Sequence, residues 1–169
     1  ASDVYKRQVS ALASNVSLVV YDGAAIVSQT DSIWDIIEAY NVTVFGCSAS
    51  FIAASEKRNI DVAEKCKNQS LRLLLSTGSP LLSNHYEYLY NAFDYPIQVG
   101  SISGGTDIIS CFALCNPLMP VVSGQIQARG LGMDVVAMDE NNQCLINQKG
   151  DLICRQAAPC MPIYFFNEN

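Results

Sequence analysis

Short apolar runs alternate with longer stretches of helical periodicity over the first two thirds of this chain, and no other sequence feature restricts the fold as strongly. The runs are apolar at successive positions, so both faces of each strand are expected to be buried, as in a parallel sheet. They cover residues 16–22, 42–47, 71–77 and 95–103. This alternation predicts βαβ units, and hence an α/β fold with a partial parallel sheet and flanking helices.

Three helices are expected between these runs. Residues 32–40 place apolar side chains at helical spacing, and Asp31 or Ser32 can cap the first turn. Further helices are expected over residues 50–59 and 80–93. The side chains that the last helix is expected to turn inward are Leu82, Tyr86, Leu89 and Tyr90.

The pattern changes after about Asn116, where glycine and proline separate short strand-like segments. These segments cover residues 124–130, 134–140 and 150–156. Asn141 and Asn142 are expected to form a hairpin turn between the last two. The tail is therefore predicted to be a small antiparallel β subdomain.

Three regions follow from this organisation. Residues 1–8 lack the apolar core of a signal peptide and are interpreted as a non-native scar. Residues 9–115 are expected to form the α/β region, and residues 116–169 the β subdomain.

Charge, cysteine content and hydropathy argue against several classes of partner and cellular location. A formal net charge of -6 disfavours binding to nucleic acid, which requires clustered lysine and arginine. The seven cysteines are an odd number without a CxxC pair, which is typical of reduced thiols. No apolar run reaches the roughly 18 residues that span a membrane. We therefore expect a cytoplasmic protein with no nucleic-acid partner and no membrane insertion.

The loops that follow the apolar runs are the candidate functional segments, because ligands of an open parallel sheet bind beyond the carboxyl ends of its strands. Three loops qualify, at residues 46–49, 76–80 and 101–107. In the third, Thr106 and Asp107 place a hydroxyl beside a carboxylate, which suits a phosphate oxygen and Mg²⁺. A Gly-Gly turn with a Thr-Asp helix cap stays open as the alternative. The loop matches neither the dinucleotide nor the Walker pattern.

Four segments resemble a known family: LSTGSPL, SISGGTDIISCF, GQIQARGLGMDV and KGDLIC, in this order and spacing. They are similar to the adenylate-forming superfamily of acyl-CoA synthetases, and the similarity extends over residues 9–169. ISGGTDIIS, with VSALAS and VYDGA before it, is most similar to the branch that activates acetoacetate. The resemblance implies part of the large N-terminal domain of a ligase that forms acetoacetyl-CoA, AMP and pyrophosphate from acetoacetate, ATP and CoA through an acyl-adenylate.

The resemblance also implies which residues bind the nucleotide. Gly78, Ser79 and Pro80 match the loop that lies against adenine in the family. Thr106 matches the threonine that contacts the α-phosphate, and Asp107 matches the acidic residue, commonly Glu, that is associated with Mg²⁺. Thr106 and Asp107 are thus the expected catalytic pair, with Asp107 as the metal residue.

The acyl pocket is implied in the same way. Gly104 stands where acetate-specific relatives carry a bulky Trp, so its hydrogen leaves room for a longer acyl chain. Ser103 and Gly105 are expected to line the same space, and Gly105 also to contact the nucleotide.

Other residues are given structural interpretations. His85, the only histidine, is expected on a helix surface, and a serine triad is disfavoured for want of a second histidine. The family's phosphate loop, ribose-binding Asp and C-terminal lysine have no counterpart here, so the chain alone is expected to be inactive. The alternatives are another short- or medium-chain acyl-CoA synthetase, a non-catalytic truncated product, or a generic Rossmann-like oxidoreductase.

Overall fold

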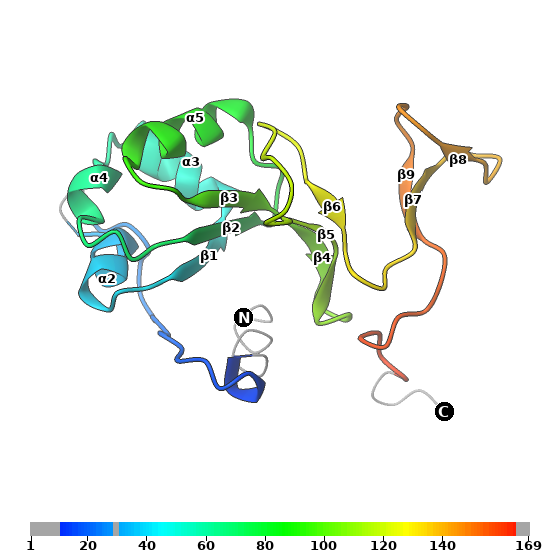
Figure 1. The fold of residues 1–169 in the computed structure, drawn as a ribbon, viewed down its shortest axis with the longest axis horizontal. Helices are drawn as coiled ribbons and strands as arrows, with labels where there is room; N and C mark the ends of the chain where they lie inside the picture. Colours follow the sequence, from blue (N-terminus) through cyan, green and yellow to red (C-terminus); the bar gives the residue numbers. More distant parts are fainter. Residues whose placement is uncertain (1–10, 29–30, 165–169) are drawn as a thin grey trace.

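A three-stranded parallel sheet organises the first part of the chain (Figure 1). The computed structural model describes residues 11–28 and 31–164, so the expected scar at residues 1–8 lies outside the described part. In their order across the sheet, the strands are β1 (Val44–Ser48), β2 (Leu73–Thr77) and β3 (Gln98–Ser101). All three run parallel, which confirms the expected α/β class.

One helix precedes β1, and the others connect the strands. The helices are α2 (Ile33–Ala39), α3 (Ala49–Lys57), α4 (Val62–Lys65) and α5 (Ser83–Ala92). The Asp35 carboxylate accepts a hydrogen bond from the backbone N–H of Ser32, and the Ser48 hydroxyl accepts one from Phe51 N–H, so local side chains fix the starts of α2 and α3. The predicted helices therefore form, and α4 is a short addition that periodicity did not indicate.

The core lies on the face of the sheet that α3 and α5 cover. The register aligns Phe45 with Leu74 and Leu74 with Val99, so one row of apolar side chains crosses all three strands. Trp34 and Phe51 pack on Phe45, with ring centroids 5.4 to 5.7 Å apart within this trio. Each buried side chain of this size stabilises the fold by roughly 1.5–3 kcal/mol.

Two antiparallel sheets follow (Figure 1). The first contains β4 (Ser103–Gly105), β5 (Ser110–Leu114) and β6 (Ala128–Arg129). The second has the order β8-β7-β9, with β7 (Val135–Met138), β8 (Cys144–Leu145) and β9 (Asp151–Cys154). The expected boundary between the α/β region and the β subdomain lies at about Asn116. β5 precedes this boundary and β6 follows it, and the two strands pair with each other.

Two sequence expectations about strands are wrong. Residues 16–22 are exposed and form no strand, and no strand in the described part of the chain pairs with them. The turn at Asn141 and Asn142 does form, with Asn142 at a φ of 60°, but it joins β7 to the short strand β8. β9 instead pairs with the other edge of β7.

Helix α5 differs from expectation in the side chains that it buries. Tyr86 and Leu89 face the core as predicted, but Leu82 is 59% exposed and Tyr90 40% exposed. Leu82 precedes the first helical turn, and the Tyr90 hydroxyl accepts a hydrogen bond from Val99 N–H at the sheet edge. His85 is also buried, at 8% exposure, which corrects its expected surface position.

All seven cysteines fall within the described residues and are free thiols. Over the same residues, no helix combines the length and apolar character needed to cross a bilayer.

Candidate functional site

The carboxyl ends of β2 and β3 lie side by side and bring two of the predicted loops together. Ser76 is the register partner of Ser101, and its carbonyl oxygen accepts a hydrogen bond of 2.8 Å from Ile102 N–H. The loop after β2 and the connection into β4 therefore start from one hydrogen-bonded edge. This is the edge at which parallel α/β sheets bind ligands.

The loop after β2 exposes its backbone. Gly78 has a φ of +88°, a left-handed conformation that disfavours any residue with a side chain, and no atom lies within 4 Å of where its Cβ would be. Ser79 and Pro80 are exposed, and Leu81 then enters the core. The turn can thus offer backbone N–H and C=O groups to a planar ligand edge.

The predicted acyl-pocket residues belong to the hairpin of β4 and β5. The register shifts between Ser103 and Gly104, and a Cβ at Gly104 would lie 2.5 Å from the carbonyl oxygen of Ser110. At Gly105, by contrast, no atom lies within 4 Å of the Cβ position. The two glycines therefore have different surroundings although they are adjacent in sequence.

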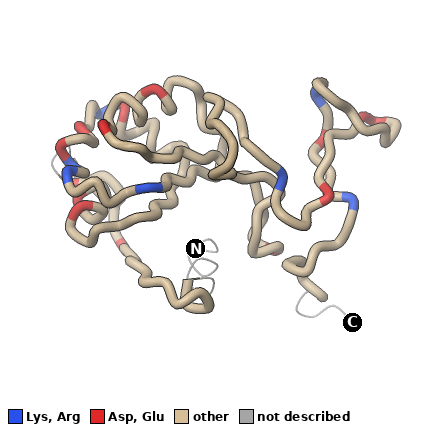
Figure 2. Tube along the Cα trace, in the orientation of Figure 1, with Lys and Arg blue, Asp and Glu red and all other residues tan. Residues whose placement is uncertain are grey.

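Thr106 and Asp107 occupy the turn of this hairpin, and both are exposed. The backbone turns there, with Ile109 N–H donating to the carbonyl oxygen of Thr106 at 3.4 Å, so the helix-cap alternative is wrong. Asp107 is the only charged side chain between residues 95 and 128, an otherwise uncharged stretch in Figure 2. The hairpin turn therefore presents one hydroxyl and one isolated carboxylate to solvent.

This donor set fits Mg²⁺ bound together with a substrate phosphate. Mg²⁺ in nucleotide sites is held by one or two carboxylates, substrate phosphates and several waters, so a complete protein cage is not required. In the described part of the chain, no group of three His, Cys, Asp or Glu side chains converges to hold a metal by itself. A metal bound at Asp107 would therefore need further ligands from a phosphate and from water.

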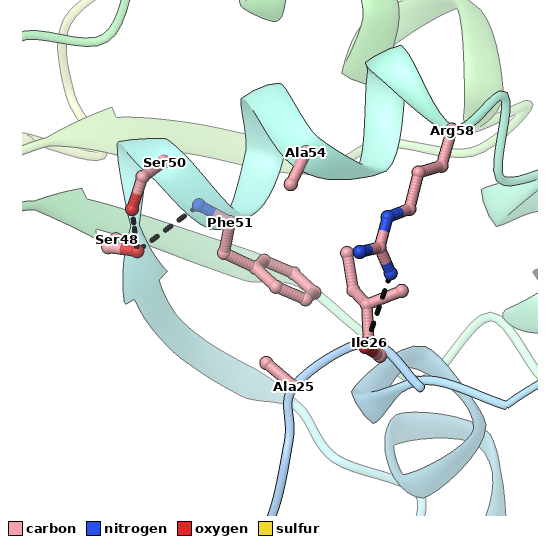
Figure 3. A pocket seen from close by; sticks show the side chains of 7 residues that line it. All are labelled: Ala25, Ile26, Ser48, Ser50, Phe51, Ala54 and Arg58. Atoms are coloured by element: carbon pink, nitrogen blue, oxygen red, sulfur yellow. Dashed lines mark hydrogen bonds between the residues drawn. The ribbon is translucent and has the colours of Figure 1, made fainter. Parts of the chain in front are cut away.

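A shallow cavity of about 260 Å³ extends along α3, from Ser48 in the first predicted loop to Arg58 at the end of the helix (Figure 3). Its polar groups bind one another: the Ser48 and Ser50 hydroxyls lie 2.8 Å apart, and the Arg58 guanidinium donates to the carbonyl oxygen of Ile26 at 3.2 Å. The remaining lining residues are Ala25, Phe51 and Ala54. None of the predicted site residues lines this cavity, and we assign it no ligand.

Ser76 was predicted as part of the second loop without a role of its own, and the structure buries it fully at the carboxyl end of β2. Its hydroxyl has no hydrogen-bond partner among the residues that the structure describes. A buried hydroxyl usually has a partner, so this position stands out at the predicted edge. The available signal was a polar residue inside an otherwise apolar run.

Known proteins of similar sequence include acetoacetyl-CoA synthetases. No protein-family model matches the chain. It is 42% identical to the acetoacetyl-CoA synthetase of Gallus gallus over 95% of this chain and 24% of that protein. It is 40% identical to the acetoacetyl-coenzyme A synthetase of Rhizobium meliloti (strain 1021) over 94% of this chain and 24% of that protein. The chain therefore spans about a quarter of the length of these curated relatives.

Solved structures agree with this relationship. Acetoacetyl-CoA synthetase from Streptomyces lividans superposes with a TM-score of 0.88 and 34% identity, covering 97% of this chain and 26% of that one. The anthranilate CoA ligase AuaEII, with a TM-score of 0.69 and 20% identity, shares the fold over 85% of this chain.

Proposed function

We propose, from the homology of this chain to one segment of acetoacetyl-CoA synthetases, that it supplies part of the active site of an ATP-dependent ligase that makes acetoacetyl-CoA. The observation that carries the proposal is the agreement of sequence and fold over nearly the whole chain with proteins of that name. ATP, acetoacetate and CoA are the proposed substrates.

The proposed reaction has two displacement steps. A carboxylate oxygen of acetoacetate attacks the α-phosphorus of ATP, and the bond to pyrophosphate breaks to leave an acyl-adenylate. The CoA thiol then loses its proton and attacks the acyl carbonyl, so that the thioester forms and AMP leaves. Enzymes promote such steps mainly by positioning and by stabilising charge, which needs no protein nucleophile.

The nucleotide would lie across the edge formed by β2 and the β4–β5 hairpin. The exposed backbone of residues 78–80 would face adenine, and the Thr106 hydroxyl would donate to an α-phosphate oxygen. Asp107 would hold Mg²⁺ through one carboxylate oxygen or a bridging water, and the metal would screen phosphate charge. The side-by-side strand ends and the exposure of these residues support this arrangement.

The acyl chain would lie next to Ser103, Gly104 and Gly105. The collision expected for a side chain at Gly104 gives that glycine a backbone role besides its proposed role in the pocket. A bulky substitution there would disturb the hairpin and the pocket together. Ser103, which is half-buried one position earlier, is the better site for testing acyl selectivity.

The deciding experiment uses the full-length ligase that contains this chain. We expect ATP-dependent thioester formation with a higher kcat/KM for acetoacetate than for acetate or butyrate. A Ser103→Leu variant should lose acetoacetate activity more than acetate activity, because added bulk excludes the longer acid. Preference for acetate or butyrate in the unmodified enzyme would identify another acyl-CoA synthetase and overturn the choice of acetoacetate.

A further inference from the structure

The first turn of α5 is held by a carboxylate from α3. His85 Nδ1 lies 2.7 Å from Glu56 Oε2, and the Asn84 side-chain amide donates to the same oxygen at 2.9 Å. A carboxylate accepts hydrogen bonds, so His85 carries its proton on Nδ1 and donates it to Glu56. Two consecutive residues of α5 thus share one acceptor on a neighbouring helix.

This contact lies at the start of α5, which has no side-chain cap of its own. The residue before the helix, Leu82, has no side chain that can accept a hydrogen bond from the first turn. Glu56 brings a negative charge to that end of the helix, where the unpaired N–H groups carry partial positive charge. Hydrogen bonds to an ionised group are also stronger than neutral ones. Glu56 of α3 thus helps to fix the start of α5, alongside the hydrogen bond of 3.3 Å that Ser123 Oγ donates to the carbonyl oxygen of Ser83.

The exposed turn of residues 78–80 leads directly into this anchored end. On its other side the turn continues from β2, where Ser76 accepts the hydrogen bond from Ile102. The turn itself is open, with no atom within 4 Å of the Cβ position of Gly78. Its position thus depends on what holds its two ends: the strand ladder on one side, and on the other the buried Leu81 together with the contact between Glu56 and His85.

We propose that Glu56 and His85 are positioning residues that hold the turn of residues 78–80 in place for the adenine ring of ATP. This inference rests on the proposed ligase function. Neither side chain would touch substrate. Their effect reaches the nucleotide through the first turn of α5, so it concerns the binding of ATP and leaves acetoacetate binding unchanged.

The test compares two variants of the full-length ligase that each remove a tether between the α3 region and α5. Glu56→Ala removes the acceptor at the start of α5. Tyr88→Phe is the matched control, because the Tyr88 hydroxyl donates to the carbonyl oxygen of Ile60 at 2.8 Å, farther along α5 from the turn. We expect Glu56→Ala to raise KM for ATP by about three- to tenfold, because it removes the acceptor of two hydrogen bonds at the start of α5. kcat and KM for acetoacetate should stay within about twofold in both variants.

The inference is overturned if Glu56→Ala leaves KM for ATP unchanged, or if Tyr88→Phe raises it equally. Asn84→Ala, which keeps the Glu56 to His85 bond, provides a milder test should Glu56→Ala not fold. A rise in KM for ATP of about twofold supports the inference, and no rise counts against it. Failure of the unmodified ligase to form acetoacetyl-CoA contradicts the proposed function itself and is seen before any variant is made.

Discussion

Gly104 faces the backbone of the opposing strand so closely that a Cβ there would lie 2.5 Å from the carbonyl oxygen of Ser110. Real Cβ contacts do not occur at this distance, so the hairpin must shift to accept any side chain at Gly104. Gly105 meets no such limit. One of the two adjacent glycines is therefore required by strand packing, whatever the substrate.

This difference predicts unequal effects on stability. Gly104→Ala should lower the free energy of unfolding by about 1–3 kcal/mol, because the backbone of β5 has to move. Gly105→Ala should change it by less than about 0.5 kcal/mol. Urea unfolding of the two full-length variants measures both values. Equal destabilisation would mean that the strands do not approach at Gly104 as described.

Thr106 and Asp107 should matter for catalysis and not for folding, because both are exposed in the hairpin turn. Thr106→Ala or Asp107→Ala in the full-length ligase is expected to lower ATP–pyrophosphate exchange by roughly ten- to a thousandfold, the scale of losing one electrostatic partner of the transition state. Ser110→Ala, exposed in the same hairpin, is the control and should exchange normally. If both variants exchange pyrophosphate at the unmodified rate, Thr106 and Asp107 have no catalytic role and only shape the turn.

The 169-residue chain on its own is expected to lack ligase activity. Adenylation places charge on several phosphate oxygens, and Thr106 and Asp107 supply only two of the groups that would stabilise it. Pyrophosphate release from purified chain, ATP and acetoacetate tests this. Pyrophosphate release above that of an Asp107→Ala control would show that the chain alone catalyses adenylation.

Much of the helical layer could be predicted from the sequence because the signals are local. Trp34 and Ile37 are spaced for one face of α2, and Ser48 is a cap residue directly before α3. The apolar runs that became β1, β2 and β3 were also recognisable, since a strand buried on both faces has few polar positions. The edge that gathers the predicted site loops follows from these strands alone.

The remaining features depend on partners far away in sequence. Residues 16–22 have the composition of a strand, but a strand needs a hydrogen-bonding neighbour, and none is present in the described part of the chain. His85 is buried beside Glu56, which belongs to another helix and accepts a hydrogen bond from its Nδ1. The turn conformation of Thr106 and Asp107 depends on the pairing of β4 with β5. Contacts between residues that are far apart in sequence cannot be predicted from a local pattern.

Two buried serines should respond oppositely to the loss of their hydroxyl. Ser55 Oγ accepts a hydrogen bond of 3.1 Å from Trp34 Nε1, so Ser55→Ala leaves a buried indole N–H unpaired and should cost about 1–3 kcal/mol. Ser76, equally buried, has no partner among the described residues, so Ser76→Ala should be neutral or slightly stabilising. Thermal unfolding separates the two. A large loss for Ser76→Ala would reveal a partner supplied by the rest of the enzyme or by water.

Cys66 and Cys144 should differ in reactivity. Burial, with smaller effects from the carboxylates of Glu38 and Asp35, raises the pKa of Cys66 to about 12. At pH 8 its thiolate fraction is then about one in ten thousand, and the side chain is only 3% exposed. Iodoacetamide followed by peptide mass spectrometry should label the exposed Cys144 and spare Cys66. Labelling of Cys66 at the same rate would contradict its burial.

The same raised pKa has a consequence for stability. Because the folded state keeps the Cys66 proton more tightly than the unfolded state, its contribution is complete below the unfolded pKa of about 8.5 and is lost as pH rises toward 12. A Cys66→Ala variant should therefore show a shallower decline of unfolding free energy between about pH 8.5 and 10 than the unmodified protein. Parallel declines would rule out this linkage.

The parallel pairing of β1, β2 and β3 also sets an order of assembly. β7 and β8 meet across a short turn, as do β4 and β5, so these hairpins close small loops and can form within microseconds. β1 can pair with β2 only after the intervening chain with α3 and α4 has been brought back, and β3 joins only after α5. Contacts between distant residues bear the largest loop-closure entropy and slow folding. The carboxyl ends of β2 and β3, from which the loops of the proposed nucleotide site start, are therefore expected to come together late on the folding pathway.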